Sequence, residues 1–539
     1  MASGSTKTSA PPRNAPPSDA EVVLVADGVG VRFPRAIRDA VHDVSLTLRA
    51  GERVALIGPS GSGKTTLALA LLGAIPSLVQ AERRGDVRWA GLGDRKLATG
   101  TGVAASVLQD TDAQLVALTV EDELAFALEN RGLLPTDIDR RIDAALTRPP
   151  GAGLDRCART LTLSGGWRQR LALAAALAET PGALVIDEPV AHLDGEAAAD
   201  AIAAVGETCR HGAAALLVEH RIDQVAGLVD RVLVLGSDGH PVALGDTEST
   251  LRALARGNDH GLRLPPSVRV AAALERAGVR DGTSDALPVA LEALGFDRRP
   301  APSTGAPLLT IDFAAVRRGH RAVLESVDLV IREGEAVGIT GRNGAGKTTL
   351  ALLAAGALRP AAGVVLRHHA GAPIFVPQNP ALAFATGSLA AEAARRGLGW
   401  TDAARAIART GLAPEPDRHP LTLSHGERRR LALALALAPP EPRLVILDEP
   451  ASGLDGIGLA ALDADVEALR ARGSAVMIVA HDLDWLARVT DRIALIENGR
   501  IAVDRPSLAF LAGVVSGHLP LKAPPAASLA ARLGWSFAA

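Results

Sequence analysis

The chain carries the stretch Gly58-Pro-Ser-Gly-Ser-Gly-Lys64-Thr65, which returns as Gly341-Arg-Asn-Gly-Ala-Gly-Lys347-Thr348. Both stretches fit the pattern G-x-x-x-x-G-K-[ST], in which backbone N–H groups and a helix N-terminus cradle phosphate groups. Before the first stretch stands a short apolar run, and a helix-forming run follows it. The sequence therefore predicts two phosphate-binding loops on one chain.

Each loop holds the groups that a nucleoside triphosphate with its magnesium ion requires. We expect Lys64 and Lys347 to contact the β- and γ-phosphates, and Thr65 and Thr348 to hold Mg²⁺. The residues expected to bind ATP in these loops are Gly58, Pro59, Ser60, Gly61, Ser62, Gly63, Lys64, Thr65 and Thr66, and Gly341, Arg342, Asn343, Gly344, Ala345, Gly346, Lys347, Thr348 and Thr349.

The composition restricts the class of protein. The 539 residues are 48% hydrophobic, which supports sizeable cores, and the formal net charge of −3 gives no signature of nucleic-acid binding. The two cysteines, Cys157 and Cys209, have no metal-binding spacing. No apolar run reaches the roughly 18 residues that span a bilayer. We therefore expect a soluble chain that reaches a membrane only through partners.

The repeat sets the domain organisation. We expect a disordered leader over 1–20, a first ATPase domain over 21–245, a linker over 246–307, a second ATPase domain over 308–505 and a C-terminal tail over 506–539. Within the linker, only one short helix is indicated, from Val268 to Gly278, and turn-prone sequence follows it.

Short apolar runs alternate with helical runs inside each domain. Val54–Ile57, Leu184–Ile186 and Leu216–Val218 read as buried strands in the first domain, as do Leu444–Leu447 and Val476–Val479 in the second. Buried strands separated by helices predict a mostly parallel sheet covered on both faces. The alternating segments 21–33 and 43–49 predict an antiparallel addition. The fold class is therefore α/β, with two tandem P-loop NTPase domains that each add an antiparallel β subdomain and a helical subdomain.

Two acidic pairs follow buried strands, Asp187-Glu188 and Asp448-Glu449. Adjacent carboxylates at the end of an apolar strand are costly unless they serve a cation or a reaction. We expect each Asp to position Mg²⁺ and each Glu to polarise the attacking water, a role worth roughly 10²–10⁴ in rate.

At this point the residues match a family. Leu163-Ser-Gly-Gly-Trp167 and Leu423-Ser-His-Gly-Glu427 resemble the signature loop of ABC ATPases, and they precede Asp187 and Asp448 at closely matched spacings. The resemblance implies catalytic roles for further residues: the Q-loop glutamines Gln109 and Gln378, which also link to Mg²⁺, and the switch histidines His220 and His481, which sense the γ-phosphate. Leu193-Asp194 and Leu454-Asp455 resemble the D-loops of the family.

In this family, two ATPase domains pair head to tail, and the resemblance implies the same pairing within this chain. The first ATP site would combine the phosphate loop of the first domain with Ser424 and Gly426 of the second. The second site would combine the other phosphate loop with Ser164, Gly165 and Gly166.

Two departures from the family pattern predict unequal sites. His425 replaces the first signature glycine, where the backbone must approach the γ-phosphate closely. Phe33 stands where the family stacks an aromatic ring on adenine, and Arg318 stands at the matching position of the second domain. We expect two active sites that hold ATP differently.

The segment from Val107 to Asn130 refines the resemblance. It is similar to the region after the Q-loop in ATPases of energy-coupling factor (ECF) transporters, including a second glutamine, Gln114, and the pattern T-V-E-x-E-x-A-F. The resemblance implies an ATP-hydrolysing subunit, peripheral on the cytoplasmic face of the cell membrane. It would act with a transmembrane coupling subunit and a small substrate-binding membrane subunit to import a vitamin, a vitamin precursor or a transition-metal ion.

Two alternatives stay open. The chain could be the tandem ATPase of a sugar importer, although the segment after Gln109 does not favour it. It could also be a soluble tandem ATPase that acts on ribosomes, for which a long basic helical linker would be expected. Residues 237–307 are poor in lysine and rich in turn formers.

Overall fold

The chain folds as two compact units, unit 1 (residues 1–193 and 197–253) and unit 2 (residues 194–196 and 254–539). The computed structural model describes residues 20–91, 103–109, 111–190, 193, 195–257, 259–280, 283, 285–296, 305–319, 321–369, 371–423, 425–438 and 443–535. The leader expected over 1–20 lies outside these residues apart from its last position. Among the described residues, no helix combines the length and the apolar character that crossing a membrane requires.

Unit 1 is built on a six-stranded sheet in the order β5-β6-β7-β3-β8-β9. Every neighbouring pair is parallel except β8 with β9. The expected buried strands are present, since every residue of β6 and β7 is buried. The strands are β3 (Arg53–Ile57), β5 (Ala104–Val107), β6 (Ala183–Asp187), β7 (Ala214–Glu219), β8 (Arg231–Leu235) and β9 (Pro241–Asp246).

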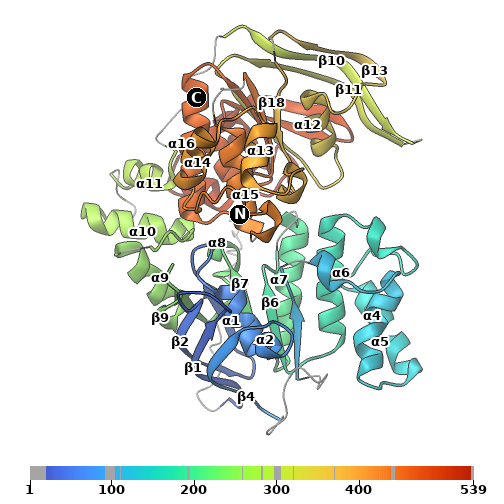
Figure 1. Cartoon of the computed structure of the whole chain (residues 1–539), viewed down its shortest axis with the longest axis vertical. Coiled ribbons are helices and arrows are strands. Elements are labelled where there is room, and N and C mark those ends of the chain that lie inside the picture. The colour runs from blue at the N-terminus through green and yellow to red at the C-terminus, as the bar shows by residue number, and fades with distance from the viewer. Residues whose placement is uncertain are drawn as a thin grey trace, which may run out of the picture. The chain divides into compact units, whose positions relative to one another are not determined.

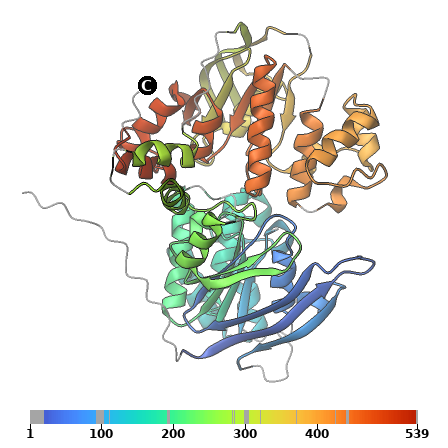
Figure 2. The same ribbon diagram turned by 90° about the vertical axis from the view of Figure 1, so that its left-hand side faces the viewer.

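A separate antiparallel sheet, β2-β1-β4, completes unit 1 and is visible as the blue ribbons in Figure 2. It contains β1 (Val22–Arg32), β2 (Val41–Arg49) and β4 (Glu82–Trp89), so the expected antiparallel addition is confirmed. Helices cover the parallel sheet, and α4, α5 and α6 form a helical subdomain beside it (Figure 1). The helices are α1 (Lys64–Leu71), α2 (Ala74–Ser77), α3 (Thr111–Gln114), α4 (Val120–Asn130), α5 (Pro135–Thr147), α6 (Gly165–Ala178), α7 (Gly195–Arg210), α8 (Ile222–Val225) and α9 (Thr247–Arg256).

Unit 2 repeats this topology. Its six-stranded sheet has the order β14-β15-β16-β12-β17-β18, position for position that of unit 1, and its antiparallel sheet has the order β11-β10-β13. The strands are β10 (Pro307–Arg318), β11 (Arg321–Arg332), β12 (Ala336–Thr340), β13 (Ala362–Arg367), β14 (Ile374–Val376), β15 (Leu444–Asp448), β16 (Ala475–Val479), β17 (Arg492–Glu497) and β18 (Arg500–Pro506). The predicted α/β fold class with two tandem P-loop domains is thus confirmed.

The helices of unit 2 include one, α11, that the sequence analysis did not expect. The helix indicated at Val268 is present as α10, but α11 follows it where only turns were expected, and both pack into the core of unit 2 together with α19 near the C-terminus. A stacked pair, Phe296 and Trp535, joins the α11 region to the end of the chain. The helices are α10 (Pro266–Ala277), α11 (Ala286–Leu294), α12 (Lys347–Ala355), α13 (Leu389–Arg395), α14 (Trp400–Arg409), α15 (His425–Ala436), α16 (Gly456–Ala471), α17 (Leu483–Val489), α18 (Ser507–Val515) and α19 (Pro525–Arg532).

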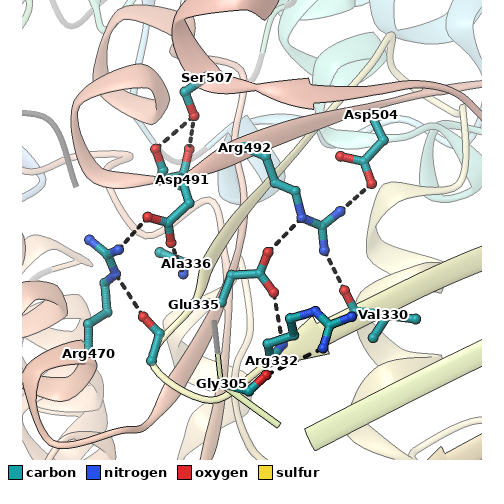
Figure 3. Close-up of polar contacts among 12 residues, drawn as sticks. Gly305, Val330, Arg332, Glu335, Ala336, Arg470, Asp491, Arg492, Asp504 and Ser507 are labelled. Atoms are coloured by element: carbon teal, nitrogen blue, oxygen red, sulfur yellow. Dashed lines mark hydrogen bonds and ion pairs between the residues drawn. The ribbon is translucent and has the colours of Figure 1, made fainter. Parts of the chain in front are cut away.

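A polar network around the buried Glu335 fastens the antiparallel sheet of unit 2 to its parallel core (Figure 3). Arg492 at the start of β17 donates to Glu335 at 2.6 Å and also pairs with Asp504 and the carbonyl of Val330 in β11. Glu335 in turn accepts from the backbone N–H of Arg332 at 2.8 Å. The network lies at the amino ends of the parallel strands, which leaves the carboxyl ends, where ligands bind in sheets of this kind, free for a site.

Unit 1 contains the matching arginine–glutamate network. Arg231 donates to Glu52 at 2.8 Å, and Glu52 accepts from the backbone N–H of Arg49 at 2.9 Å. The duplication therefore extends beyond the glycine loops to the polar contacts that hold the two sheets of each unit together.

Candidate active sites

The two phosphate loops have nearly the same geometry. In unit 1 the ammonium of Lys64 donates to the carbonyls of Gly58 and Pro59, both at 2.8 Å. In unit 2 Lys347 donates to the carbonyls of Gly341 and Arg342 at 2.8 and 3.0 Å. Each lysine thus lies over its own loop at the start of α1 or α12, where helix N–H groups face a bound anion.

Glycine is required where each loop enters its helix. Gly63 and Gly346 have φ of +87° and +109°, in the left-handed region. A Cβ on Gly63 would lie 2.2 Å from the carbonyl oxygen of Ala40, and one on Gly346 would lie 2.7 Å from Cδ2 of Leu324. The antiparallel sheet therefore packs directly against the base of each phosphate loop.

The acidic residues that end β6 and β15 offer oxygen ligands beside these loops. The hydroxyl of Thr65 donates to Asp187 at 2.6 Å, and burial raises the pKa of the Asp187 carboxyl. Asp448 also has a pKa raised chiefly by burial, and its Oδ2 is buried without a hydrogen-bond partner among the described residues. A hydroxyl and a carboxylate in this arrangement are the hard oxygen donors that Mg²⁺ prefers, so both sites fit that ion.

In unit 1, three of the expected catalytic side chains meet at one atom. Gln109 donates to Oε1 of Glu188 at 2.7 Å, and Nε2 of His220 lies 3.4 Å from the same oxygen. Burial and the nearby Lys64 lower the pKa of His220 well below its usual value, which keeps the imidazole neutral. The sequence spacing placed these residues on three separate loops, and the fold brings them together.

Unit 2 brings the corresponding glutamate and histidine together in the same way. Nε2 of His481 lies 3.4 Å from Oε1 of Glu449. Burial raises the pKa of Glu449 to about 7, although the cationic Lys347 lowers it. Glu188 and Glu449 both adopt positive φ, 55° and 49°, which is uncommon for this residue type and typical of strained functional positions.

The sequence analysis missed a difference on the signature helices. In unit 1, Gln169 of α6 donates to the carbonyl of Glu188 at 3.2 Å. Unit 2 has Arg429 at the matching position of α15, where it donates to the carbonyl of Glu449 at 2.6 Å and to that of Gln378. Aligning the two repeats from their signature loops would have revealed the exchange of a neutral amide for a buried cation.

A second missed residue is Glu219, the last residue of β7. Its side chain is buried, and burial raises the pKa of this carboxyl well above its usual value, with Glu188 contributing. The matching residue of unit 2 is Ala480. The acidic neighbour of the switch histidine thus precedes it in unit 1, as Glu219, and follows it in unit 2, as Asp482.

Two further glutamates hold the segments that follow the Q-loops. Glu123 accepts from the backbone N–H groups of Val116 and Ala117 at 2.9 and 2.7 Å. Glu392 accepts from the N–H of Ala385 at 3.1 Å and from Arg396. The pattern T-V-E-x-E contained this signal, because Glu123 is its second acidic residue.

The signature loops and the expected adenine contacts are only partly described. Ser164 directly precedes α6, which Gly165 and Gly166 begin, and its side chain makes no capping hydrogen bond. Ser424 and the side chain of His425 lie outside the described residues, and Gly426 stands in the first turn of α15. Phe33 lines a pocket of about 360 Å³ at the end of β1. Arg318 ends β10 opposite Arg321 and is exposed.

Sheet order, glycine loops and acidic strand ends together define a tandem pair of P-loop nucleoside triphosphatases. The family model described as "ABC transporter" matches residues 41–191 and 324–452. The chain belongs to this family of ATP-binding cassette proteins and is an ATPase with two nucleotide-binding domains.

Known relatives cover nearly the whole chain. An ABC transporter ATP-binding protein of Streptomyces avermitilis is 34% identical over 526 residues, covering 89% of this chain and 93% of that protein. YkoD of Bacillus subtilis, whose name gives HMP/thiamine import as a provisional role, is 29% identical over 507 residues, covering 89% of this chain and 91% of that protein.

Solved structures share the fold at lower sequence identity. A model of ribosome-bound archaeal Pelota and ABCE1 contains a chain with a TM-score of 0.65 and 21% identity, covering 90% of this chain and 80% of that one. A structure named RNase-L Inhibitor has a TM-score of 0.58 and 23% identity, covering 91% of this chain and 93% of that one. At this identity the likeness shows the fold alone.

Proposed function

We propose that the chain is the ATP-hydrolysing subunit of an ECF-type importer of a micronutrient: a vitamin, a vitamin precursor or a transition-metal ion. It would lie on the cytoplasmic face of the membrane against a transmembrane coupling subunit. A small substrate-binding membrane subunit would complete the transporter. The observation that carries this proposal is an exposed apolar surface immediately after the first Q-loop.

That surface consists of two paired segments in unit 1. Leu118 is 74% exposed and Leu161 is 81% exposed. Their segments are joined, because the N–H of Thr160 donates to the carbonyl of Leu118 at 3.0 Å and its hydroxyl donates to that of Ala117 at 2.7 Å. Large apolar side chains held in water by a rigid scaffold are typical of a docking surface.

Unit 2 offers less apolar surface at the matching positions. Leu161 keeps an apolar counterpart, Leu421, which is 51% exposed, but Leu118 corresponds to Gly387 and the exposed Phe126 corresponds to Arg395. A membrane partner would therefore contact the two units differently. The relative with a provisional role in HMP/thiamine import supports a vitamin or precursor as the cargo.

The phosphate loops, acidic pairs and switch histidines would perform the hydrolysis. We assign Glu188 and Glu449 the polarisation of the attacking water, with His220 and His481 orienting each glutamate and reaching the γ-phosphate. Mg²⁺, when bound, neutralises charge on the β- and γ-phosphate oxygens. The head-to-tail pairing would complete each site with the signature loop of the other unit.

The docking proposal is tested by capture of the membrane partner. The full chain is co-expressed with a polytopic coupling protein and a small membrane protein encoded beside it, and purified from detergent extracts. Leu118→Asp with Leu161→Asp should abolish co-purification and substrate uptake. The control is Leu134→Asp, because Leu134 is 67% exposed and precedes α5 outside the paired segments. Recovery of the chain on ribosomes and never with a membrane protein would overturn the proposal.

The inequality of the two sites has its own test. Glu188→Gln and Glu449→Gln are measured separately in the assembled complex. We expect unequal losses of ATP turnover, because the two glutamates differ in their neighbours. Equal losses would refute the inequality and leave the transport proposal untouched.

A further inference from the structure

The stretch Asp259–Leu264 has contacts that the hydrolytic function does not explain. It lies just beyond the boundary between the two units, after α9 and before α10, and belongs to unit 2. Leu262 and Leu264 are buried in this stretch, and the backbone turns at His260 and Gly261, both with positive φ. It is therefore a folded element of unit 2.

Its first contact reaches the D-loop. The N–H of Gly456, the residue after the D-loop Asp455, donates to the carbonyl of Gly261 at 2.8 Å. The approach is tight, because a Cβ on Gly261 would lie 2.5 Å from Cγ1 of Ile457. Asp455 itself caps α16 by accepting from the N–H of Gly458 at 2.8 Å. The stretch thus holds the turn between the D-loop and its helix.

Its second contact reaches the switch loop. Arg263 donates to Oδ2 of Asp482 at 2.7 Å, and the two side chains are only 14% and 10% exposed. Asp482 directly follows His481, and its other oxygen caps α17 by accepting from the N–H of Trp485 at 3.1 Å. A charge-assisted hydrogen bond at low exposure is stronger than a surface ion pair. Arg263 thus immobilises the residue next to the switch histidine.

Unit 1 has a different arrangement at the corresponding place. The residue after its switch histidine His220 is Arg221, which lies 3.4 Å from Asp223, a neighbour in its own loop. The contact in unit 2 therefore connects its switch loop to the chain that arrives from unit 1, whereas the Arg221–Asp223 contact in unit 1 joins residues two apart in the sequence.

We propose that Asp259–Leu264 is a brace that positions the D-loop and the switch loop of unit 2 for ATP hydrolysis, with Arg263 as its positioning residue. The brace rests on the ATPase activity of the family and not on the identity of the transported substrate. The brace would make the segment that connects the two units a part of the second ATP site.

The test uses the full chain and two matched pairs of variants. Arg263→Ala removes the contact to the switch loop, and Arg256→Ala is its control, because Arg256 forms an exposed ion pair with Glu275 in the same region. Gly261→Ala disrupts the contact to the D-loop. Gly278→Ala is its control, because Gly278 has φ of +67° with open space around the site of a Cβ.

Two readouts are measured on each variant: hydrogen exchange of peptides covering 455–459 and 481–489, and the kcat and KM of ATP hydrolysis. Arg263→Ala should raise exchange in 481–489 about fivefold. It should lower kcat about 3- to 10-fold with KM nearly unchanged, since it misplaces a reacting group without touching the nucleotide. Arg263→Lys, which keeps a positively charged donor nitrogen, should restore part of kcat.

Three results would overturn the brace. Exchange in both peptides could stay at the level of the unaltered chain. Exchange could rise while kcat stays the same, which would remove the positioning role. Exchange could rise equally across both units, which would show general stabilisation only.

Discussion

Gln114 supplies the sharpest test of how the first Q-loop is held. Its side-chain carbonyl accepts from the N–H of Leu108 at 2.8 Å, and its NH₂ donates to the carbonyl of Ser106 at 2.8 Å. Both backbone partners lie just before Gln109, whose own amide donates to Glu188. The second glutamine of the ECF-like pattern thus ties the Q-loop to the end of β5, and we call this pair of hydrogen bonds the staple.

Replacing Gln114 by Ala removes both hydrogen bonds. At about 0.5–1.5 kcal/mol for each neutral pair, the loss amounts to about 1–3 kcal/mol, concentrated on the Q-loop because β5 is the edge strand of its sheet. Gln114→Glu keeps the acceptor for Leu108 but loses the donor to Ser106, so about half of that loss is expected. Unit 2 has Ala383 at the matching position and provides the natural comparison.

The assay combines local hydrogen exchange at 106–109 with ATP turnover of the full chain. Exchange should rise by an amount corresponding to about 1–3 kcal/mol, and kcat should fall because Gln109 is no longer held against Glu188. The control is Arg140→Ala, which breaks an exposed ion pair on α5 and should change neither quantity. Unchanged exchange at Leu108 in Gln114→Ala would refute the staple.

Three further predictions concern single positions. Gly63→Ala should abolish ATP binding because its Cβ has no room, whereas Gly61→Ala, with positive φ but open space, should cost only about 1 kcal/mol, as measured by nucleotide titration. Arg429→Gln should lower ATP turnover. It should change the unfolding free energy by less than about 2 kcal/mol, because the substitution loses a charged hydrogen bond but no longer requires a cation to be buried. The pKa of Glu392 is lowered to about 2, because Arg395, Arg396 and a backbone N–H outweigh the opposing effect of burial. Glu392 should therefore stabilise the fold above pH 4.5, and this contribution should be lost as the pH falls toward 2. Urea unfolding of Glu392→Gln should lack this pH dependence.

Much of the fold and of the site could be predicted because their signals are local. A glycine loop between a buried strand and a helix, or an acidic pair after an apolar run, needs only neighbouring residues to be recognised. The duplication then doubled each signal. Consequently the parallel sheets, the antiparallel additions and the meeting of Gln109, Glu188 and His220 were within reach of the sequence.

The features that the sequence did not reveal depend on contacts between distant segments. The sequence of α11 reads as turns because Gly282 and Pro288 flank or interrupt a short apolar run. In the structure this run packs against α10 and against α19, which lies far along the chain. Arg429 is the middle one of three consecutive arginines, and nothing in the local sequence marks it as the buried one. Its burial follows from the Q-loop and the Glu449 loop closing over it, which no local pattern states.

The two units share the charged and polar residues expected to act on ATP, and they differ in the groups around these residues. Lysine, threonine, aspartate, glutamate and histidine occur at matching places in both, and Glu188 and Glu449 even share their strained backbone. The supporting groups differ: a neutral amide, Gln169, in unit 1 is a buried guanidinium in unit 2.

This pattern is what fusion into one chain permits. Two separate copies of one gene product must serve both sides of a symmetric pair, so any change in a supporting group appears at both sites. A fused chain can alter one Q-loop for a membrane partner and let its connecting segment hold the switch loop of the other unit. We infer that the two sites keep the same reacting residues while the groups connected to each site have changed. If Gln114→Ala and Arg263→Ala each altered hydrogen exchange equally at both sites, this inference would be contradicted.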